Sequence, residues 1–367
     1  MNGPRCRRDQ GAANGGQGRA GGGSGLPRYA AIDLGTNNCR LLVAERRRDG
    51  FRVVDAFSRI VRLGEGLARD GHLSHAAMTR AIQALKVCAE KLSRHRITRI
   101  RAVATEACRQ ARNAETFLHR VKADTGLDLE IISQEEEARL ALTGCAPLLQ
   151  AEIPNALVFD IGGGSTEIIR LRAQPDPAEG ESPRLGIGAW HSMPIGVVGL
   201  AERYGARDVR EETYEQMVAD VESELEAVAV RQGIVDALAT GRMQMIGTSG
   251  TVTTLAGVYQ NLQRYDRRRV DGCYLAFDTV HAVSRRIAAM DHTQRRAHPC
   301  IGQHRADLVV PGCAILEAIC RTWPVGSLRV ADRGLREGML LQMMAHVGAD
   351  GLATPHARAG VDASAPG

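Results

Sequence analysis

Short apolar strands and amphipathic helices alternate along this chain in a pattern that occurs twice. The first copy predicts three strands joined by hairpins, at residues 29–32, 39–44 and 51–57. The second copy predicts strands at residues 156–159, 168–172 and 184–190. The first two strands of each copy are separated by a polar turn that begins Asp-x-Gly, at Asp33-Leu-Gly-Thr-Asn37 and at Asp160-Ile-Gly-Gly-Gly-Ser165.

Each copy continues with an amphipathic helix, a further strand that ends in small polar residues, and another helix. Ser74 is the predicted N-cap of the first amphipathic helix and Asp208 that of the second. The further strands lie near residues 100–106 and 243–251, and late helices are predicted at 312–320 and 335–344. The pattern predicts an α/β fold of two β-β-β-α-β-α lobes, at residues 28–150 and 151–332, with a ligand cleft between them.

Composition supports a globular, soluble, two-domain protein. The 367 residues are 44% hydrophobic and 24% charged, which excludes a wholly disordered, fibrous or disulfide-scaffold protein. The net charge of +5 resides mostly in residues 1–28, where five arginines face one aspartate, so no nucleic-acid partner is expected. Residues 1–27 form a predicted disordered Gly/Arg-rich tail and 349–367 a flexible tail.

Cysteine spacing and hydropathy indicate the cytoplasm as the compartment. The nine cysteines form no C-x-x-C pair and read as reduced, mostly buried thiols. No stretch has the apolar length of a signal peptide core or of a membrane span, so no membrane association is expected. A homodimer is compatible with the sequence.

The two Asp-x-Gly turns carry the candidate chemistry. Glycines at the end of a strand let backbone amides approach phosphate oxygens, a role that suits Gly162, Gly163, Gly164 and Ser165. An aspartate before each turn would repel phosphate unless a cation lies between them. We therefore expect Mg²⁺ or another divalent cation, anchored by Asp160 with Glu167 as a partner. No Walker P-loop occurs, and residues 165–171 read as a strand, which excludes a dinucleotide fingerprint.

A glutamate triplet at residues 135–137 supplies a candidate for acid–base chemistry. Ser133 fits an N-cap with Glu136 at the third helical position, a capping box, and Glu135 suits the helix dipole. Glu137 is left without a helical role, and it either faces solvent or orients a water for attack on phosphorus. Arg109, just after a strand that points to the same cleft, is a candidate fork donor to phosphate.

Six motifs in order resemble the exopolyphosphatase and guanosine pentaphosphate phosphatase (Ppx/GppA) family. They lie at residues 33–37, 105–109, 132–139, 160–167, 247–251 and 334–338. The resemblance, to a short form without the C-terminal helical domain, implies a duplicated actin-like (Hsp70 and sugar-kinase ATPase, ribonuclease H-like) fold whose residues 333–348 form a helix packing on the first lobe. It also implies Glu137 as the catalytic carboxylate and Asp160, Glu167 and Asp33 at the divalent ion. The expected phosphate-binding residues are Gly35, Thr36, Asn37, Arg109, Gly162, Gly163, Gly164, Ser165, Ser249 and Gly250.

Several functions remain open at this level. The first is removal of terminal phosphate from inorganic polyphosphate by metal-assisted attack of water, and the second is hydrolysis of guanosine pentaphosphate. A small-molecule kinase of the same fold and a non-catalytic nucleotide or polyphosphate sensor are the further alternatives. The basic run at residues 264–269 reads more simply as a solvated loop than as a guide for a polyanion.

Overall fold

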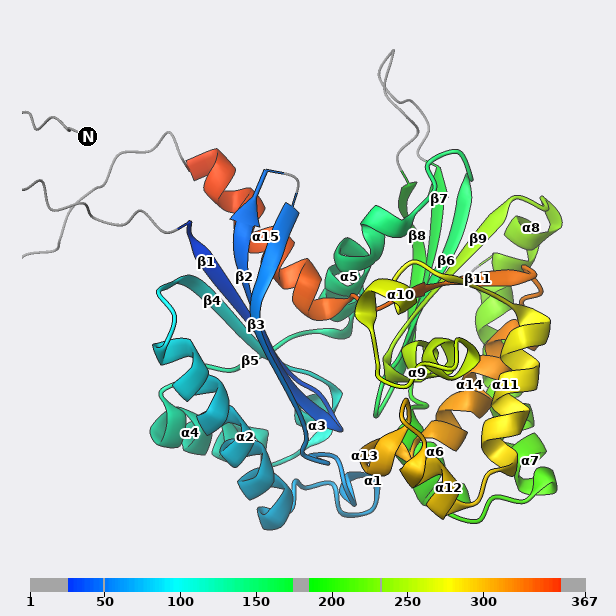
Figure 1. Cartoon of the computed structure of the whole chain (residues 1–367), viewed down its shortest axis with the longest axis horizontal. Coiled ribbons are helices and arrows are strands. Elements are labelled where there is room, and N and C mark those ends of the chain that lie inside the picture. Colours follow the sequence, from blue (N-terminus) through cyan, green and yellow to red (C-terminus); the bar gives the residue numbers. More distant parts are fainter. Residues whose placement is uncertain (1–25, 49, 174–184, 232, 351–367) are drawn as a thin grey trace, which may run out of the picture.

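A computed structural model describes residues 26–48, 50–173, 185–231 and 233–350, which form two mixed β-sheets with helices on their faces (Figure 1). Nearly all of the two predicted tails lies outside the described residues. Most strand and helix boundaries extend the predicted segments by a few residues, but the strands predicted to reach residues 106 and 251 end at Ala104 and Thr248, where helices follow. No helix in the described part of the chain is long and apolar enough to cross a membrane.

The first lobe holds a five-stranded sheet in the order β3-β2-β1-β4-β5. Ser74 caps the long helix of this lobe as predicted, because its side chain accepts a hydrogen bond from the Ala77 amide. The strands are β1 (Arg28–Leu34), β2 (Asn38–Arg47), β3 (Gly50–Ile60), β4 (Ile97–Ala104) and β5 (Glu130–Ile131). The helices are α1 (Leu67–Asp70), α2 (His75–Ser93), α3 (Glu106–Gln110), α4 (Ala114–Thr125) and α5 (Gln134–Cys145), followed by the 3₁₀ turn η1 (Ala146–Leu148).

The second lobe holds a six-stranded sheet in the order β10-β11-β9-β6-β7-β8. Its strands are β6 (Asn155–Ile161), β7 (Thr166–Ala173), β8 (Leu185–Met193), β9 (Met243–Thr248), β10 (Tyr274–Ala276) and β11 (Ser327–Ala331). Its helices are α6 (Val197–Tyr204), α7 (Glu211–Arg231), α8 (Ile234–Ala239), α9 (Gly250–Tyr259), α10 (Arg267–Val270), α11 (Phe277–Ala289), α12 (His292–Ala297), α13 (Gly302–Arg305) and α14 (Val309–Thr322), and α15 (Leu335–Asp350) follows.

The two sheets share one topology, which confirms the predicted duplication. In each lobe the first strand pairs antiparallel with the second and parallel with the fourth. Asp33 of β1 lies opposite Arg40 of β2, and the equivalent Asp160 of β6 lies opposite Glu167 of β7. The duplication therefore places one acidic residue per lobe at the same point, immediately before each hairpin turn.

Two predicted helix caps are wrong in part. The first backbone bond of α7 runs from the Tyr214 amide to the Arg210 carbonyl, so Arg210 is the N-cap and Asp208 lies outside the helix. Ser133 does cap α5 by accepting from the Glu136 amide at 3.1 Å. The second bond of a capping box would join the Glu136 carboxylate to the Ser133 amide. Here the Glu136 carboxylate instead forms an ion pair with Arg101 of β4 at 2.5 Å.

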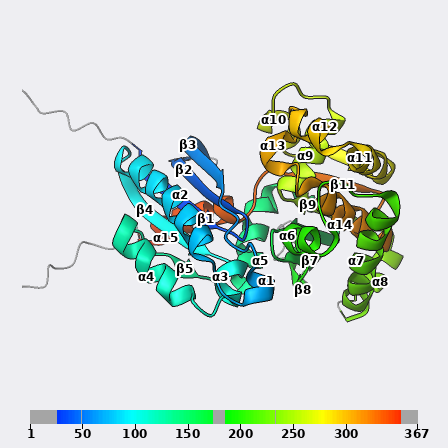
Figure 2. The same cartoon turned by 90° about the horizontal axis from the view of Figure 1, so that it is seen from below.

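Residues of β1 alternate between the two faces of the first sheet. Ala30, Ile32 and Leu34 pack with α2 and α4, whereas Tyr29 and Ala31 pack with α15. The α15 helix thus returns from the second lobe to cover the first sheet (Figures 1 and 2).

The α5 and α15 helices form the connection between the lobes. Apolar residues of α5 pack with β6 and β7 of the second lobe, and α5 also lies against α15. A Cβ on Gly144 of α5 would lie 2.1 Å from the Gly334 carbonyl oxygen, and one on Gly338 of α15 would lie 1.9 Å from that of Leu140. Only glycine permits so close an approach of the two backbones.

Candidate active site

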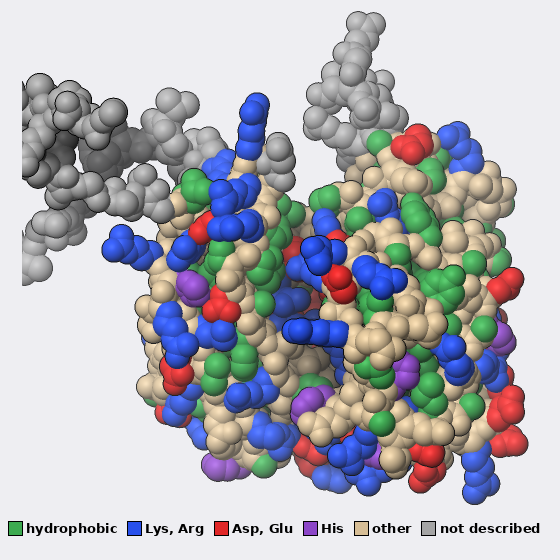
Figure 3. Space-filling model, in the orientation of Figure 1, with side chains coloured by type: hydrophobic (Ala, Val, Ile, Leu, Met, Phe, Trp, Pro, Cys, Tyr) green, Lys and Arg blue, Asp and Glu red, His purple; other side chains and the backbone are tan. Residues whose placement is uncertain are grey.

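A cavity of about 850 Å³ lies between the lobes, where the two hairpin turns meet. Figure 3 shows the surface hollowed at this place, with basic side chains around the hollow. Of the fourteen sequence-predicted site residues, all except Arg109 and Glu167 line the cavity. The twelve lining members are Asp33, Gly35, Thr36, Asn37, Glu137, Asp160, Gly162, Gly163, Gly164, Ser165, Ser249 and Gly250.

The two glycine-containing turns contact each other across the cleft. Each is a tight hairpin, closed by the Gly35 amide on the Asn38 carbonyl at 2.9 Å and by the Gly162 amide on the Ser165 carbonyl at 2.8 Å. A Cβ on Gly163 would lie 3.0 Å from the Thr36 Cβ, and one on Gly164 would lie 2.9 Å from the Thr36 Oγ1. The glycines therefore let one lobe's turn lie directly against the other's, so that the backbone amides of both line one cavity.

Buried carboxylates dominate the electrostatics of the site. Burial raises the pKa of Asp33, although Arg40 opposes the shift, and burial raises the pKa of Asp160 to about 6. Burial and then the charge of Asp160 raise the pKa of Glu167 to about 7. Glu167 does not reach the cavity lining, because its Oε1 accepts hydrogen bonds from Ser165 at 2.6 Å and Ser192 at 3.0 Å.

Glu137 faces this cavity rather than solvent. Its buried Oε2 forms an ion pair with Arg109 Nη1 at 2.7 Å, and Nη1 also donates to the Ile132 carbonyl at 2.9 Å. Burial, followed by the charge of Glu167, raises the pKa of Glu137 well above its ordinary value. A raised pKa makes this carboxylate a stronger proton acceptor than an ordinary glutamate.

Arg109 holds Glu137 in place from behind the lining. Its Nε and Nη2 donate to Glu106 Oε2 at 2.9 and 2.6 Å, and the third arm lies against Glu137. Burial alone would lower the pKa of Arg109, but the negative charges of Glu137 and Glu106 have a larger opposite effect, so the pKa of Arg109 is raised. The guanidinium thus fixes two cavity-lining carboxylates and is itself not part of the lining.

Five arginines line the cavity, and none of them is among the site residues predicted from the sequence. Arg40 and Arg336 make no ion pair or side-chain hydrogen bond with the described residues, and burial lowers the pKa of Arg336 against the opposing effect of Glu337. Arg40 carried a usable signal, since it shares a strand face with Asn38 and pairs in register with Asp33. The other three lining arginines are Arg59, Arg305 and Arg333.

The N-terminus of α9 contributes a strained residue. Ser249 has a φ of 139°, which favours glycine, and its Oγ accepts from the Thr251 and Val252 amides at 3.1 and 3.3 Å. This hydroxyl is therefore occupied as a helix cap, while Gly250, Thr251 and Thr253 continue the lining.

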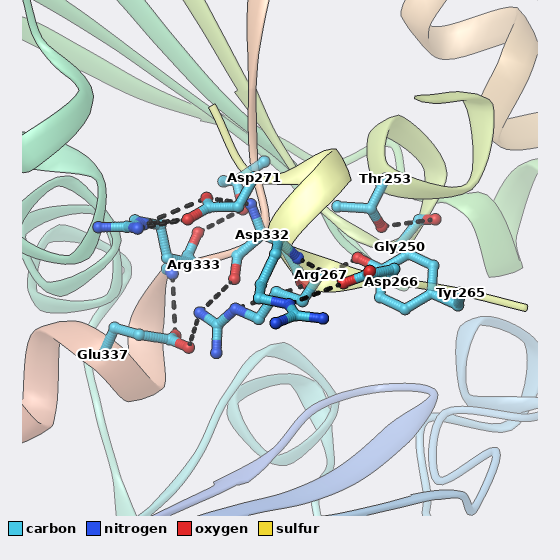
Figure 4. Close-up of polar contacts among 12 residues, drawn as sticks. Gly250, Thr253, Tyr265, Asp266, Arg267, Asp271, Asp332, Arg333 and Glu337 are labelled. Carbon is cyan, nitrogen blue, oxygen red and sulfur yellow. Dashed lines mark hydrogen bonds and ion pairs between the residues drawn. The ribbon is translucent and has the colours of Figure 1, made fainter. Parts of the chain in front are cut away.

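A polar network fixes α15 beside the cavity (Figure 4). Arg267 Nη2 donates to Glu337 Oε1 at 2.9 Å and to the Asp332 carbonyl at 2.5 Å, and Tyr265 donates to Asp332 Oδ2 at 2.6 Å. Arg333 pairs with Asp271 in the same network. These contacts join the α10 region, the end of β11 and the start of α15.

The carboxylates fit a divalent cation that uses few protein ligands. No three His, Cys, Asp or Glu side chains among residues that the structure describes converge as a metal site. The charge of Asp33 nevertheless contributes to the raised pKa of Asp160, and neither aspartate forms an ion pair in the described part of the chain. Mg²⁺ characteristically binds one or two carboxylates and completes its shell with water and substrate phosphates, so these residues fit it.

The protein has two lobes of one topology, as in an actin-like fold. Their paired hairpin turns line a cavity rich in carboxylates and arginines, which suits phosphate chemistry.

Comparison with solved structures agrees with this assignment. An exopolyphosphatase-like protein is 29% identical with a TM-score of 0.76, covering 86% of this chain and 97% of the other. An exopolyphosphatase from Cytophaga hutchinsonii is 27% identical with a TM-score of 0.74, covering 87% and 98%. The Aquifex aeolicus Ppx/GppA phosphatase, type II variant, is 30% identical with a TM-score of 0.66, covering 87% and 100%.

The family model of the Ppx/GppA phosphatase family matches residues 42–347, and the chain belongs to this family. The resemblance inferred from the six motifs is confirmed, as is the two-lobe actin-like fold. The protein is accordingly a hydrolase that acts on phosphoanhydride bonds.

Proposed function

We propose that this chain removes the terminal phosphate of inorganic polyphosphate, with Glu137 as the base that activates water. The observation that carries the proposal is the buried carboxylate of Glu137, which lines the cavity where both hairpin turns meet and is held there by an ion pair with Arg109 at 2.7 Å. Two structural neighbours that span most of the chain are named exopolyphosphatase or exopolyphosphatase-like.

In the proposed reaction, water attacks the terminal phosphorus. The water oxygen forms a bond to phosphorus as the bridging P–O bond breaks, the water proton passes to Glu137, and the bridging oxygen leaves with the shortened chain. Arg109 keeps the Glu137 carboxylate oriented toward the cavity. The turn amides near Gly35 and Gly163, together with Arg40, stabilise the charge on the transferred group.

Asp33 and Asp160 are the proposed ligands of Mg²⁺, with Glu167 behind Asp160 as a supporting carboxylate. When bound, the ion neutralises phosphate charge and polarises the phosphoryl oxygens. Without it, the aspartates would repel the substrate.

The lining favours polyphosphate over a nucleotide. Five arginines supply charge for several phosphates, whereas Tyr265 is the one phenyl or indole ring in the described lining, and its hydroxyl is bound to Asp332. Guanosine pentaphosphate is the competing substrate.

The test is phosphate release from polyphosphate and from guanosine pentaphosphate, measured side by side in Mg²⁺. We expect the higher kcat/KM with polyphosphate, and the Glu137→Ala variant reports any contaminating phosphatase. A higher kcat/KM with guanosine pentaphosphate, or equal release by the wild-type and variant proteins, would overturn the proposal.

A further inference from the structure

Three exposed arginines lie at the edge of the cavity and serve no role described so far. Arg264, Arg268 and Arg269, here called the basic rim, are exposed; Arg264 precedes α10, and Arg268 and Arg269 lie within it. Arg264 and Arg269 form no ion pair with the described residues. Arg268 lies 3.5 Å from Asp266, but its side chain is 91% exposed, so this contact neutralises little of its charge.

The basic rim adjoins residues of the cavity itself. Tyr265, next to Arg264, lines the cavity and is 37% exposed. Arg267, next to Arg268, is bonded to the lining residues Asp332 and Glu337. Figure 3 shows basic side chains around the hollow between the lobes on this face of the molecule.

The cavity opens on the side of the basic rim. Elsewhere the lobes contact each other, through the Gly163 and Thr36 turns, through α5 and α15, and through Arg62, which pairs with Asp307 at 2.9 Å. The exposed lining residues instead lie on β3, on the segment before α10 and on α13; they are Ser58, Arg59, Tyr265, His304 and Arg305.

We infer that the basic rim binds the distal part of a long polyphosphate chain whose terminal phosphate occupies the cavity. The inference rests on the proposed function. A long polymer cannot be contained in a cavity of about 850 Å³, so the remainder of the chain must leave through the open side. There it meets Arg59 from one lobe and the basic rim from the other, and these exposed guanidinium groups bind phosphate by charge.

The test uses the variant Arg264→Glu/Arg268→Glu and a matched control, Arg94→Glu/Arg96→Glu, which makes the same charge change at exposed arginines after α2. KM is measured with long-chain polyphosphate and with tripolyphosphate, which is short enough to end inside the cavity. Thermal unfolding checks that all proteins are folded.

We expect KM for long-chain polyphosphate to rise by about tenfold in the rim variant, with kcat retained and KM for tripolyphosphate changed by less than about twofold. The salt dependence of the long-chain KM should also weaken, because fewer phosphate contacts are lost on adding salt. An unchanged long-chain KM, an equal rise with both substrates, or an equal rise in the control would overturn the inference. Failure of the proposed function would appear differently, as wild-type protein that releases phosphate from neither polyphosphate.

Discussion

In the absence of metal, the buried negative charge of Asp160 should lower the free energy of unfolding of the protein. The variant Asp160→Asn, which removes this charge, tests that expectation. Burial raises the pKa of Asp160 to about 6 in the folded protein, against about 3.9 in an unfolded chain. The folded state therefore binds more protons than the unfolded state between these two values, and stability falls as pH rises through that window. Above pH 6 Asp160 is ionised in the folded protein, and the free energy of unfolding is lowered by the full cost of its buried charge.

The size of this effect follows from the shift. Two pKa units correspond to about 3 kcal/mol, and relaxation of the site reduces this, so we expect the asparagine variant to be more stable at pH 8 by ~1–3 kcal/mol. Thermal unfolding in EDTA should show a Tm higher by roughly 3–10 °C at pH 8, with the gain nearly absent at pH 4.

Asp307→Asn is the matched control, with the opposite sign. Burial raises the pKa of Asp307, but the His292 hydrogen bond and the Arg62 charge outweigh it, and the pKa is lowered. Its contribution to stability is therefore present above the unfolded pKa and is lost as pH falls through the folded one. This variant should have a lower Tm at pH 8. An Asp160→Asn protein that is no more stable than wild type at pH 8 in EDTA would refute the reasoning.

Two further predictions concern positioning and packing. Arg109→Lys should lower kcat about tenfold or more with little change in KM, because lysine cannot hold Glu106 and Glu137 at once; steady-state phosphate release measures this, and an unchanged kcat would contradict it. Gly338→Ala should lower Tm strongly, since its Cβ would lie 1.9 Å from the Leu140 carbonyl oxygen; calorimetry that shows a wild-type Tm would contradict the α5–α15 packing.

The fold was predictable because its signals are local. Strand alternation, the two Asp-x-Gly turns and the Ser74 cap each depend on residues close together in the chain, and duplication reinforced them. One predicted cap, Asp208, lies outside its helix, and the Ser133 capping box forms only in part because Arg101, on another element, pairs with the carboxylate of Glu136.

The residues of the two hairpin turns could be predicted from the sequence, whereas most of the charged residues of the cavity could not. Eleven of the twelve lining residues lie at or just after strand ends that the topology brings together, and Glu137 lies in the first turn of α5. Arg305 and Arg336 enter the cavity from late helices, and no short-range pattern indicates that. The same limit applies to Arg109 and Glu167, whose places behind the lining depend on residues of other elements, Glu137 of α5 for Arg109 and Ser192 of β8 for Glu167.

Glu137→Gln tests the central claim most directly, because it keeps the shape of the side chain and removes its capacity to accept a proton. Phosphate release from polyphosphate and polyphosphate binding should be measured on the same folded preparation in Mg²⁺. The account predicts that kcat falls about a hundredfold or more while the Kd for polyphosphate stays within a few-fold of wild type. A glutamine variant that retains a kcat near the wild-type value would contradict the assignment of Glu137 as the base.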